Sequence, residues 1–260
     1  MIHLAGLKSV SESIEKPLLY YENNVTGSIN LLKAMDAVKC KNIIFSSSAT
    51  VYGKPRYLPI DEKHPCKPYN TYGFNKFIIE EMIKDWCKTD NNKKGVILRY
   101  FNPIGAHASG LIGENPFGIP NNLMPYITQV ALGNLDRLKI YGDDYETTDG
   151  TGVRDFIHVV DLAKGHLAAI NFLEKCKDVE IFNLGTGLGH SVKEVLNSFQ
   201  KVSGISVKHE ICPRRSGDVA ISYTDVKKSK KMLEWESSLS LNEMTKDAWN
   251  WQSKNPEGYK

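Results

Sequence analysis

Short apolar runs alternate with amphipathic segments over the first hundred residues. The runs "KNIIFSS" (41–47) and "GVILRYFN" (95–102) are bounded by polar residues, which is typical of buried parallel strands. Two helices are predicted, over 24–37 and 70–88, because apolar side chains recur there at helical spacing. Strand, helix and strand in this order predict an α/β fold with a parallel sheet and right-handed crossovers.

The texture changes after residue 104. A loop rich in Gly, Pro and Asn (104–122) precedes a predicted helix over 123–133 and a short strand, "LKIYG". Further predicted elements are a helix near 159–174, the strand "VEIFNLG", a helix over 191–203, the strand "VKHEI" and a helical end reaching "WNWQ". We therefore expect a sheet domain over 1–103 and a smaller lobe over 104–260, with an interleaved border.

Composition excludes several classes of function. The 260 residues are 41% hydrophobic and 24% charged, with a net charge of +3 and one basic run at 226–232 that reads as a solvated helix face, so no nucleic-acid partner is expected. The five cysteines form no C-x-x-C pair, which disfavours disulfides and a metal site and favours a reducing compartment. No apolar run is long enough for a membrane span, and no signal peptide is visible, so we expect a cytoplasmic protein.

Tyr72 and Lys76 lie four residues apart in "YNTYGFNK" and so share one face of the predicted helix. A nearby ammonium, aided by any bound cation, favours the phenolate form of a tyrosine. Lowering a phenol pKa from about 10 to about 7 needs roughly 4 kcal/mol. Such a phenolate accepts a proton from a sugar hydroxyl while hydride leaves the same carbon. Ser48, in "FSSSATVYG" at the carboxyl end of a strand, is placed to bind the same oxygen.

The Y-x-x-x-K pattern alone is weak, and a plain pair on a helix surface is its simplest explanation. Its setting is more specific, since a serine-tipped strand comes before it and "RYFNPIGAH" after it. With further stretches along the whole chain, these segments resemble the nucleotide-sugar 4-epimerases of the extended short-chain dehydrogenase/reductase family. The further stretches are "HLAGLKSVSES", "YYENNVTGS", "GIPNNLMPYI", "DGTGVRDFIHVVDLA", "FNLGTG" and "PRRSGD".

The resemblance implies a Rossmann-like, doubly wound parallel sheet with a smaller α/β substrate lobe. It implies NAD as cofactor, UDP-galactose and UDP-glucose as substrates, and a 4-keto sugar between them. Tyr72 would be the base, Lys76 would bind the nicotinamide ribose and Ser48 would assist proton transfer. Other residues implied to contact the cofactor are Ala5, Gly6, Lys8, Asn23 and Phe101.

The resemblance also implies a nucleotide-sugar site, to which it assigns Asn102, Asn122, Leu123, Tyr141, Arg154, Arg215, Asp218 and Ser222. The two arginines would hold the diphosphate, a role that suits a rigid guanidinium fork. Two of these residues have structural alternatives: Arg154 could pair with the adjacent Asp155, and Asn122 could cap the following helix.

Neighbouring branches of the family are disfavoured by missing carboxylates. The dehydratases carry Asp-Glu directly after the strand hydroxyl, and the decarboxylases carry Glu before "VYG", whereas this chain has Ala49 and Thr50. Near the sugar's C2 substituent the family places a gating residue, often tyrosine. Ser222 stands there, so UDP-N-acetyl sugars are also expected to fit.

The family's glycine-rich NAD-binding turn is not found in its expected place. The chain starts at "MIHLAGLK", so on the order of 80 residues of the usual unit are expected to be absent, leaving an exposed apolar sheet edge. Two classes of function follow: an epimerase, or a truncated, non-catalytic remnant that binds UDP-sugar or pairs with a partner chain. The resemblance implies a homodimer through the helices near 24–37 and 70–88.

Overall fold

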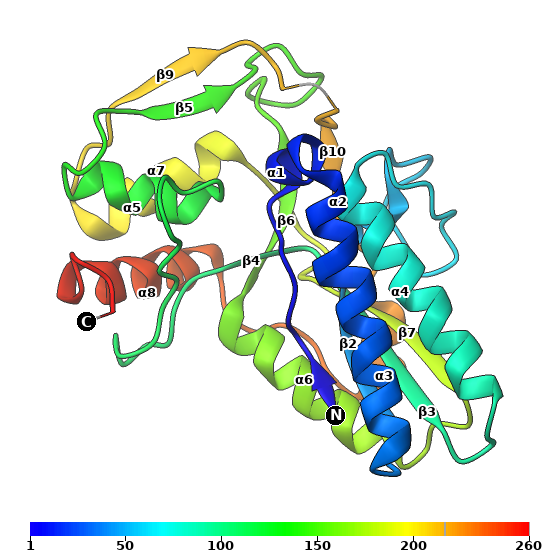
Figure 1. Cartoon of the computed structure of the whole chain (residues 1–260). Helices are drawn as coiled ribbons and strands as arrows, with labels where there is room; N and C mark the ends of the chain where they lie inside the picture. Colours follow the sequence, from blue (N-terminus) through cyan, green and yellow to red (C-terminus); the bar gives the residue numbers. More distant parts are fainter. Residues whose placement is uncertain (216, 260) are drawn as a thin grey trace. The chain divides into compact units, whose positions relative to one another are not determined.

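The computed structural model describes residues 1–215 and 217–259, which divide into two units (Figure 1). The first unit comprises Met1–Tyr100, Lys164–Leu184 and Asp225–Trp235. The second comprises Phe101–Ala163, Gly185–Thr224 and Glu236–Lys260, of which Ser216 and Lys260 are not among the described residues. Helix α6 (Val159–Leu173) begins in the second unit and ends in the first. Segments distant in sequence therefore build each unit.

A four-stranded parallel sheet forms the centre of the first unit. Its order is β1 (Ile2–His3), β2 (Asn42–Ser48), β3 (Lys94–Tyr100) and β7 (Val179–Leu184). The other elements of this unit are α1 (Val10–Glu15), α2 (Pro17–Tyr20), η1 (Tyr21–Thr26), α3 (Gly27–Ala37), η2 (Ala49–Tyr52), α4 (Thr71–Lys88) and η3 (Ser229–Leu233). Strand β1 is an edge strand of this sheet, and Ile2 and Leu4 are exposed.

Helices α3 and α4 lie side by side over one face of this sheet (Figure 1). Their apolar faces and the sheet share one core, made of Leu32, Met35, Ile43, Phe45, Ile79, Ile83, Trp86, Cys87 and Ile97. Asn70 starts α4 by accepting a hydrogen bond from the Gly73 amide at 2.8 Å, which satisfies one free donor of the first turn. Strand β2 is buried from Ile43 to Ser48, as expected for a parallel strand covered on both faces.

The second unit contains two smaller sheets. Strands β10 (Ile221–Ser222), β6 (Val153–His158) and β4 (Asn102–Ile104) run parallel, and β8 (Gly189–Ser191) pairs antiparallel with β6. Strand β5 (Leu138–Tyr141) pairs in parallel with β9 (His209–Cys212). Helices α5 (Leu123–Ala131), α7 (Val192–Ser203) and α8 (Leu241–Lys254) pack with them around a separate apolar core.

The predicted α/β class with a parallel sheet is confirmed, and most predicted elements occur within a few residues of their expected bounds. Two differ in kind. The predicted helix over 24–37 is α-helical only from Gly27, because Tyr21–Thr26 form π-helical turns. The predicted strand 95–102 ends at Tyr100, and residues 102–104 form the separate strand β4. None of the helices formed by the described residues is long and apolar enough to cross a membrane.

Candidate functional site

Tyr72 lies in the first turn of α4. Two contacts hold this turn in place, one with α1 and one with η2. The Tyr72 amide donates to Ser13 Oγ at 3.2 Å, and Ser13 on α1 is fully buried. Gly73 lies so close to η2 that a Cβ there would be 2.8 Å from the Thr50 carbonyl oxygen. Glycine at this position therefore lets the start of α4 approach the segment that follows β2.

Lys76 is buried, with 6% of its surface exposed, although it carries an ammonium. Its Nζ donates to the Ser46 carbonyl at 2.7 Å and lies 4.8 Å from the centre of the Phe45 ring. Burial lowers the Lys76 pKa to about 8, and the negative charge of Glu80 opposes this change. The ammonium is thus held at the sheet by a backbone carbonyl and an aromatic ring.

In this structure the groups around Tyr72 raise the pKa of its phenol. Burial raises the pKa of the phenol, the Tyr100 phenol raises it further, and a hydrogen bond with Ser48 acts in the opposite direction. The Lys76 ammonium lies 5.8 Å from the centre of the Tyr72 ring and donates to the Ser46 carbonyl instead. Desolvation therefore dominates, and the protein's own groups favour the neutral phenol.

Ser48 is the last residue of β2 and links the strand to η2. Its Oγ accepts hydrogen bonds from Thr50 N at 3.2 Å and from Thr50 Oγ1 at 3.0 Å. Ser48 also forms a hydrogen bond with the Tyr72 phenol, and this bond lowers the phenol pKa. The structure thus gathers Tyr72, Lys76 and Ser48 at the carboxyl end of β2, where ligands of open α/β sheets collect.

The residues assigned to the cofactor in the first unit lie on an exposed segment. Ala5, Gly6 and Lys8 follow β1 and are exposed, as is Asn23 in η1. Sequence reasoning missed the neighbouring Asn24, which is buried, accepts from Leu7 N at 2.8 Å and donates to Leu7 O at 3.0 Å. Only the repeated asparagine in "ENNV" hinted at it. Asn24 therefore fixes the exposed segment to η1.

These residues fit part of a dinucleotide. Gly6 is exposed, and a Cβ there would lie 3.1 Å from Asn24 Oδ1, so glycine lets this backbone approach the Asn24 side chain closely. Lys76 has three N–H donors, and the structure gives one of them a partner, the Ser46 carbonyl. A phenol, an ammonium and exposed backbone amides suit ribose hydroxyls and phosphate oxygens. Phe101, also assigned to the cofactor, is buried in the second unit.

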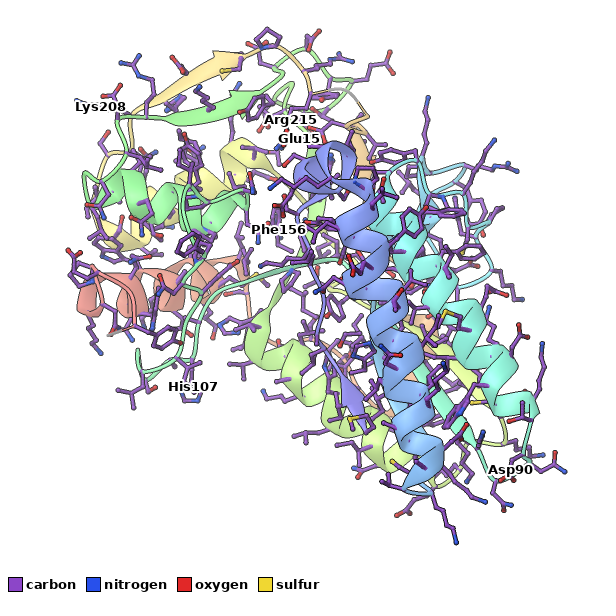
Figure 2. The ribbon with its side chains drawn as sticks, viewed as in Figure 1. Glu15, Asp90, His107, Phe156, Lys208 and Arg215 are labelled. Carbon is purple, nitrogen blue, oxygen red and sulfur yellow. The ribbon has the colours of Figure 1, made fainter. Side chains whose placement is uncertain are left out.

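In the second unit, four of the residues assigned to the nucleotide-sugar form one cluster around Asp218. Arg215, labelled in Figure 2, lies 4.4 Å over the Tyr141 ring and donates to Asp218 Oδ2 at 3.3 Å. Arg154 Nη2 lies 4.0 Å from Asp218 Oδ1. Two guanidinium groups, one carboxylate and one aromatic face are the groups that bind a diphosphate, a ribose and a base.

The two structural alternatives are not what the structure shows. Asp155 does not pair with Arg154: its buried carboxylate accepts hydrogen bonds from Thr186 N, Thr186 Oγ1, Gly187 N and Thr224 N. Asn122 makes no side-chain cap on α5, and its Nδ2 donates to Glu114 Oε1 at 2.9 Å. Both assigned residues thus keep partly or fully exposed polar side chains.

The remaining assigned residues are distributed over the second unit. Asn102 is exposed at the start of β4, and Leu123 is half-buried as the first residue of α5. Ser222, half-buried, ends β10 and pairs in register with Arg154 on β6. This register places the residue assigned to the C2 substituent beside a residue assigned to the diphosphate.

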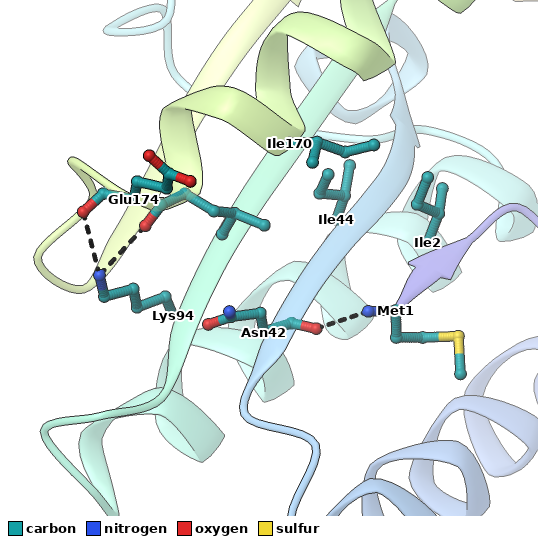
Figure 3. A pocket seen from close by; sticks show the side chains of 8 residues that line it. Met1, Ile2, Asn42, Ile44, Lys94, Ile170 and Glu174 are labelled. Atoms are coloured by element: carbon teal, nitrogen blue, oxygen red, sulfur yellow. Dashed lines mark hydrogen bonds between the residues drawn. The ribbon is translucent and has the colours of Figure 1, made fainter.

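A cavity of about 600 Å³ lies at the other end of the first unit's sheet (Figure 3). It is lined by Met1, Ile2, Ile44, Ile170 and Leu173, with Asn42, Lys94 and Glu174 at its polar border. Lys94 Nζ donates there to the carbonyls of Leu173 and Glu174. Asn42 starts β2 and Ser48 ends it, so the cavity is separate from the Tyr72 cluster.

Comparisons with known proteins agree along the whole chain. The family model described as GDP-mannose 4,6 dehydratase matches residues 1–248. The chain is 55% identical to a UDP-glucose 4-epimerase of Bos taurus, over all of this chain and 75% of that protein. Among solved structures, it is similar to a UDP-glucose 4-epimerase of Bifidobacterium longum in complex with NAD+ and UDP, with 51% identity and a TM-score of 0.95 over 99% of this chain and 77% of that one. It is also similar to a UDP-Glc/GlcNAc 4-epimerase of Campylobacter jejuni, with 37% identity and a TM-score of 0.82 over 97% of this chain and 77% of that one.

Proposed function

This chain belongs to the UDP-glucose 4-epimerase family, and from that premise we propose that it interconverts UDP-galactose and UDP-glucose with NAD as cofactor. The observation that carries the proposal is the meeting of Tyr72, Lys76 and Ser48 at the carboxyl end of β2. It is supported by relatives whose names state this activity and by a similar structure that contains NAD+ and UDP.

When bound, NAD supplies a hydride acceptor and donor for carbon 4 of the sugar, together with a positive charge on its nicotinamide ring. Tyr72 accepts the proton of the 4-hydroxyl as that carbon is oxidised to a ketone, and returns it when the other epimer forms. Ser48 shares a hydrogen bond with Tyr72 and stabilises the oxygen that gains and loses this proton. Burial and the Tyr100 phenol raise the Tyr72 pKa, and the positive charge of bound NAD would favour the phenolate instead.

Lys76 has two roles in this proposal. Its ammonium binds ribose hydroxyls through donors that the Ser46 carbonyl does not use. Its positive charge also favours the phenolate once Tyr72 has given up its proton. Ala5, Gly6, Lys8, Asn23 and Phe101 are proposed to hold other parts of NAD.

The second unit would hold the nucleotide part of the substrate. Arg154 and Arg215 bind the diphosphate, Asp218 exchanges its bonds with the arginines for bonds with a ribose, and Tyr141 borders the uracil. The contacts between Asp218 and the arginines are 3.3 and 4.0 Å long, and Arg215 is exposed, so rearranging them costs little. Asn102, Asn122 and Leu123 would contact the sugar nucleotide.

Ser222 would allow the N-acetyl sugars to bind as well. A serine side chain is several atoms smaller than tyrosine and leaves space for a C2 acetamido group. The UDP-Glc/GlcNAc 4-epimerase of Campylobacter jejuni shows that both sugars occur as substrates among similar structures. Assays with UDP-galactose and with UDP-N-acetylgalactosamine under the same conditions test whether both sugars are substrates. Turnover of UDP-galactose without turnover of UDP-N-acetylgalactosamine would contradict this role of Ser222.

The epimerase proposal itself is tested with UDP-galactose deuterated at carbon 4. The chain is incubated with NAD, and the product is analysed by mass spectrometry and NMR. Formation of UDP-glucose with deuterium kept at carbon 4 is expected, because hydride leaves and returns within one bound complex. Deuterium lost to solvent, or absence of UDP-glucose, would refute this chemistry.

A homodimer, a cytoplasmic location and a place in galactose metabolism complete the proposal. Ile29 on α3 and Phe74 on α4 are apolar and exposed, as the faces of two helices that pack against a second copy should be. The five cysteines are free thiols, which suits a reducing compartment. Sedimentation of the chain and of a variant with Phe74→Lys would show whether α4 carries the interface.

A further inference from the structure

A buried ion pair lies beneath the Tyr72 cluster and takes no part in the chemistry proposed above. The guanidinium of Arg99 on β3 donates from Nε and Nη2 to both carboxylate oxygens of Glu80 on α4. Only 3% of the Arg99 side chain and none of the Glu80 side chain is exposed. Ser47 Oγ on β2 donates to Glu80 Oε1 at 2.5 Å. The carboxylate therefore joins one helix to two strands.

Glu80 and its partner Ser47 lie close in sequence to the members of the Tyr72 cluster. Glu80 is one helical turn beyond Lys76 and two beyond Tyr72 on α4. Ser47 precedes Ser48 on β2. A shift of α4 by one residue relative to β2 would move Tyr72 by about 1.5 Å along the helix axis, which is enough to break a hydrogen bond with Ser48.

Further contacts extend the network across the sheet. The Arg99 guanidinium lies 4.9 Å over the Tyr52 ring, and Tyr52 donates to Asn183 Oδ1 at 2.6 Å on β7. Asn183 in turn accepts this bond while its Nδ2 donates to the Ile60 carbonyl at 3.0 Å. The guanidinium fork thus has a carboxylate on one side and an aromatic ring against its face, a geometry that lysine cannot reproduce.

A buried ion pair is weak evidence for stability, because removing two charges from water costs about as much as their attraction returns. A well-packed apolar group could fill the same space without that cost. Geometric specificity is the remaining explanation, since a bidentate pair fixes both distance and angle where an apolar contact tolerates sliding.

We propose that Glu80, held by Arg99 and Ser47, is a positioning residue that sets the register of α4 on β2 and thereby places Lys76, one helical turn before it, at the Ser46 carbonyl. It acts through Lys76 and Tyr72 and touches neither substrate nor cofactor. The inference rests on the proposed function only for its catalytic consequence. Its structural part concerns Lys76 in the protein alone.

The first test measures the Lys76 pKa by NMR of lysine labelled at Cε and Nζ. The charged and titratable groups facing Lys76 are Tyr72 and Glu80 on its own helix and His3 on β1. Glu80→Gln removes a negative charge and leaves Arg99 uncompensated, so the Lys76 pKa falls by about one unit. The control is Glu81→Gln, which alters an exposed neighbour paired with Lys84 and leaves the Lys76 pKa unchanged. An unchanged Lys76 pKa in Glu80→Gln overturns the proposal.

The second test separates position from charge and avoids a variant that fails to fold. The triple variant Ser47→Ala, Glu80→Leu and Arg99→Met replaces the network with apolar groups of similar size, which buried ion pairs often tolerate. We expect the thermal midpoint of the triple variant to stay close to that of the original chain, and its Lys76 pKa to fall less than in Glu80→Gln. We expect its kcat to fall about tenfold, while its KM for UDP-galactose stays within twofold. Wild-type kcat in a folded triple variant overturns the positioning role. Full kcat in a Tyr72→Phe variant, in contrast, would refute the proposed function and would leave the structural part of this inference standing.

Discussion

Replacing Lys76 with methionine is expected to stabilise the fold near neutral pH while it removes activity. Lys76 is buried, and burial lowers its pKa from the ordinary 10.5 to about 8. At pH 7 both the folded and the unfolded chain are protonated at this position, so the folded chain carries the full cost of a buried ammonium. The 2.5-unit difference corresponds to about 3 kcal/mol of unfolding free energy.

This cost has a defined pH dependence. Between pH 8 and 10.5 the unfolded chain binds more protons at Lys76 than the folded chain, so stability rises with pH across that window. The destabilisation falls from about 3 kcal/mol at pH 7 to less than about 1 kcal/mol at pH 10. Loss of the hydrogen bond to the Ser46 carbonyl costs the variant about 1 kcal/mol, which offsets part of the gain and leaves this slope in place.

The assay is urea unfolding followed by circular dichroism at intervals from pH 7 to pH 10, for the original chain and for Lys76→Met. The difference in unfolding free energy between the two should change by about 2 to 3 kcal/mol over this range, in favour of the original chain as pH rises. Lys88→Met, at an exposed position on the same helix, is the matched control and should show no such change. A difference that stays constant with pH would refute the idea that a charged ammonium is buried at Lys76.

Three further substitutions probe the second unit. In steady-state assays, Arg154→Lys should raise KM for UDP-galactose about tenfold with little change in kcat, because an ammonium loses the bidentate contact with a diphosphate. The control Arg137→Lys, at an exposed position, should leave KM unchanged. Asp155→Asn should cost about 2 to 4 kcal/mol in urea unfolding, since its carboxylate accepts four hydrogen bonds and an amide presents donors in their place. Ser222→Tyr should reduce turnover of UDP-N-acetylgalactosamine at least tenfold relative to UDP-galactose, and equal losses for both sugars would contradict the role given to Ser222.

The central sheet and its two covering helices could be predicted from periodicity because their signals are local. Phe45, Ile79 and Ile97 belong to apolar runs or helical stripes and meet in one core. Strand β6, "VRDFIH", was not predicted, because Arg154 and Asp155 interrupt its apolar pattern. The partners that make these polar residues acceptable come from distant segments, such as Thr186 and Thr224 for Asp155.

The candidate site divides in the same way. Tyr72, Lys76 and Ser48 could be selected because a helical turn and a strand end are visible in the sequence. Their pKa values could not be predicted, since burial depends on the whole unit and is the largest cause of the raised Tyr72 pKa. Glu80 and Arg99 gave no signal, because a glutamate on a helix and an arginine in a strand acquire meaning only when the fold buries them together.

The central claim is that the Tyr72 phenol exchanges the proton of the sugar's 4-hydroxyl. Its most direct measurement is the rate of UDP-galactose to UDP-glucose conversion by Tyr72→Phe, with Tyr69→Phe, an exposed tyrosine just before α4, as the control. We expect the first variant to lose at least a hundredfold in kcat, within the range for removal of a general base, and the second to retain its rate. Undiminished conversion by Tyr72→Phe would contradict the claim.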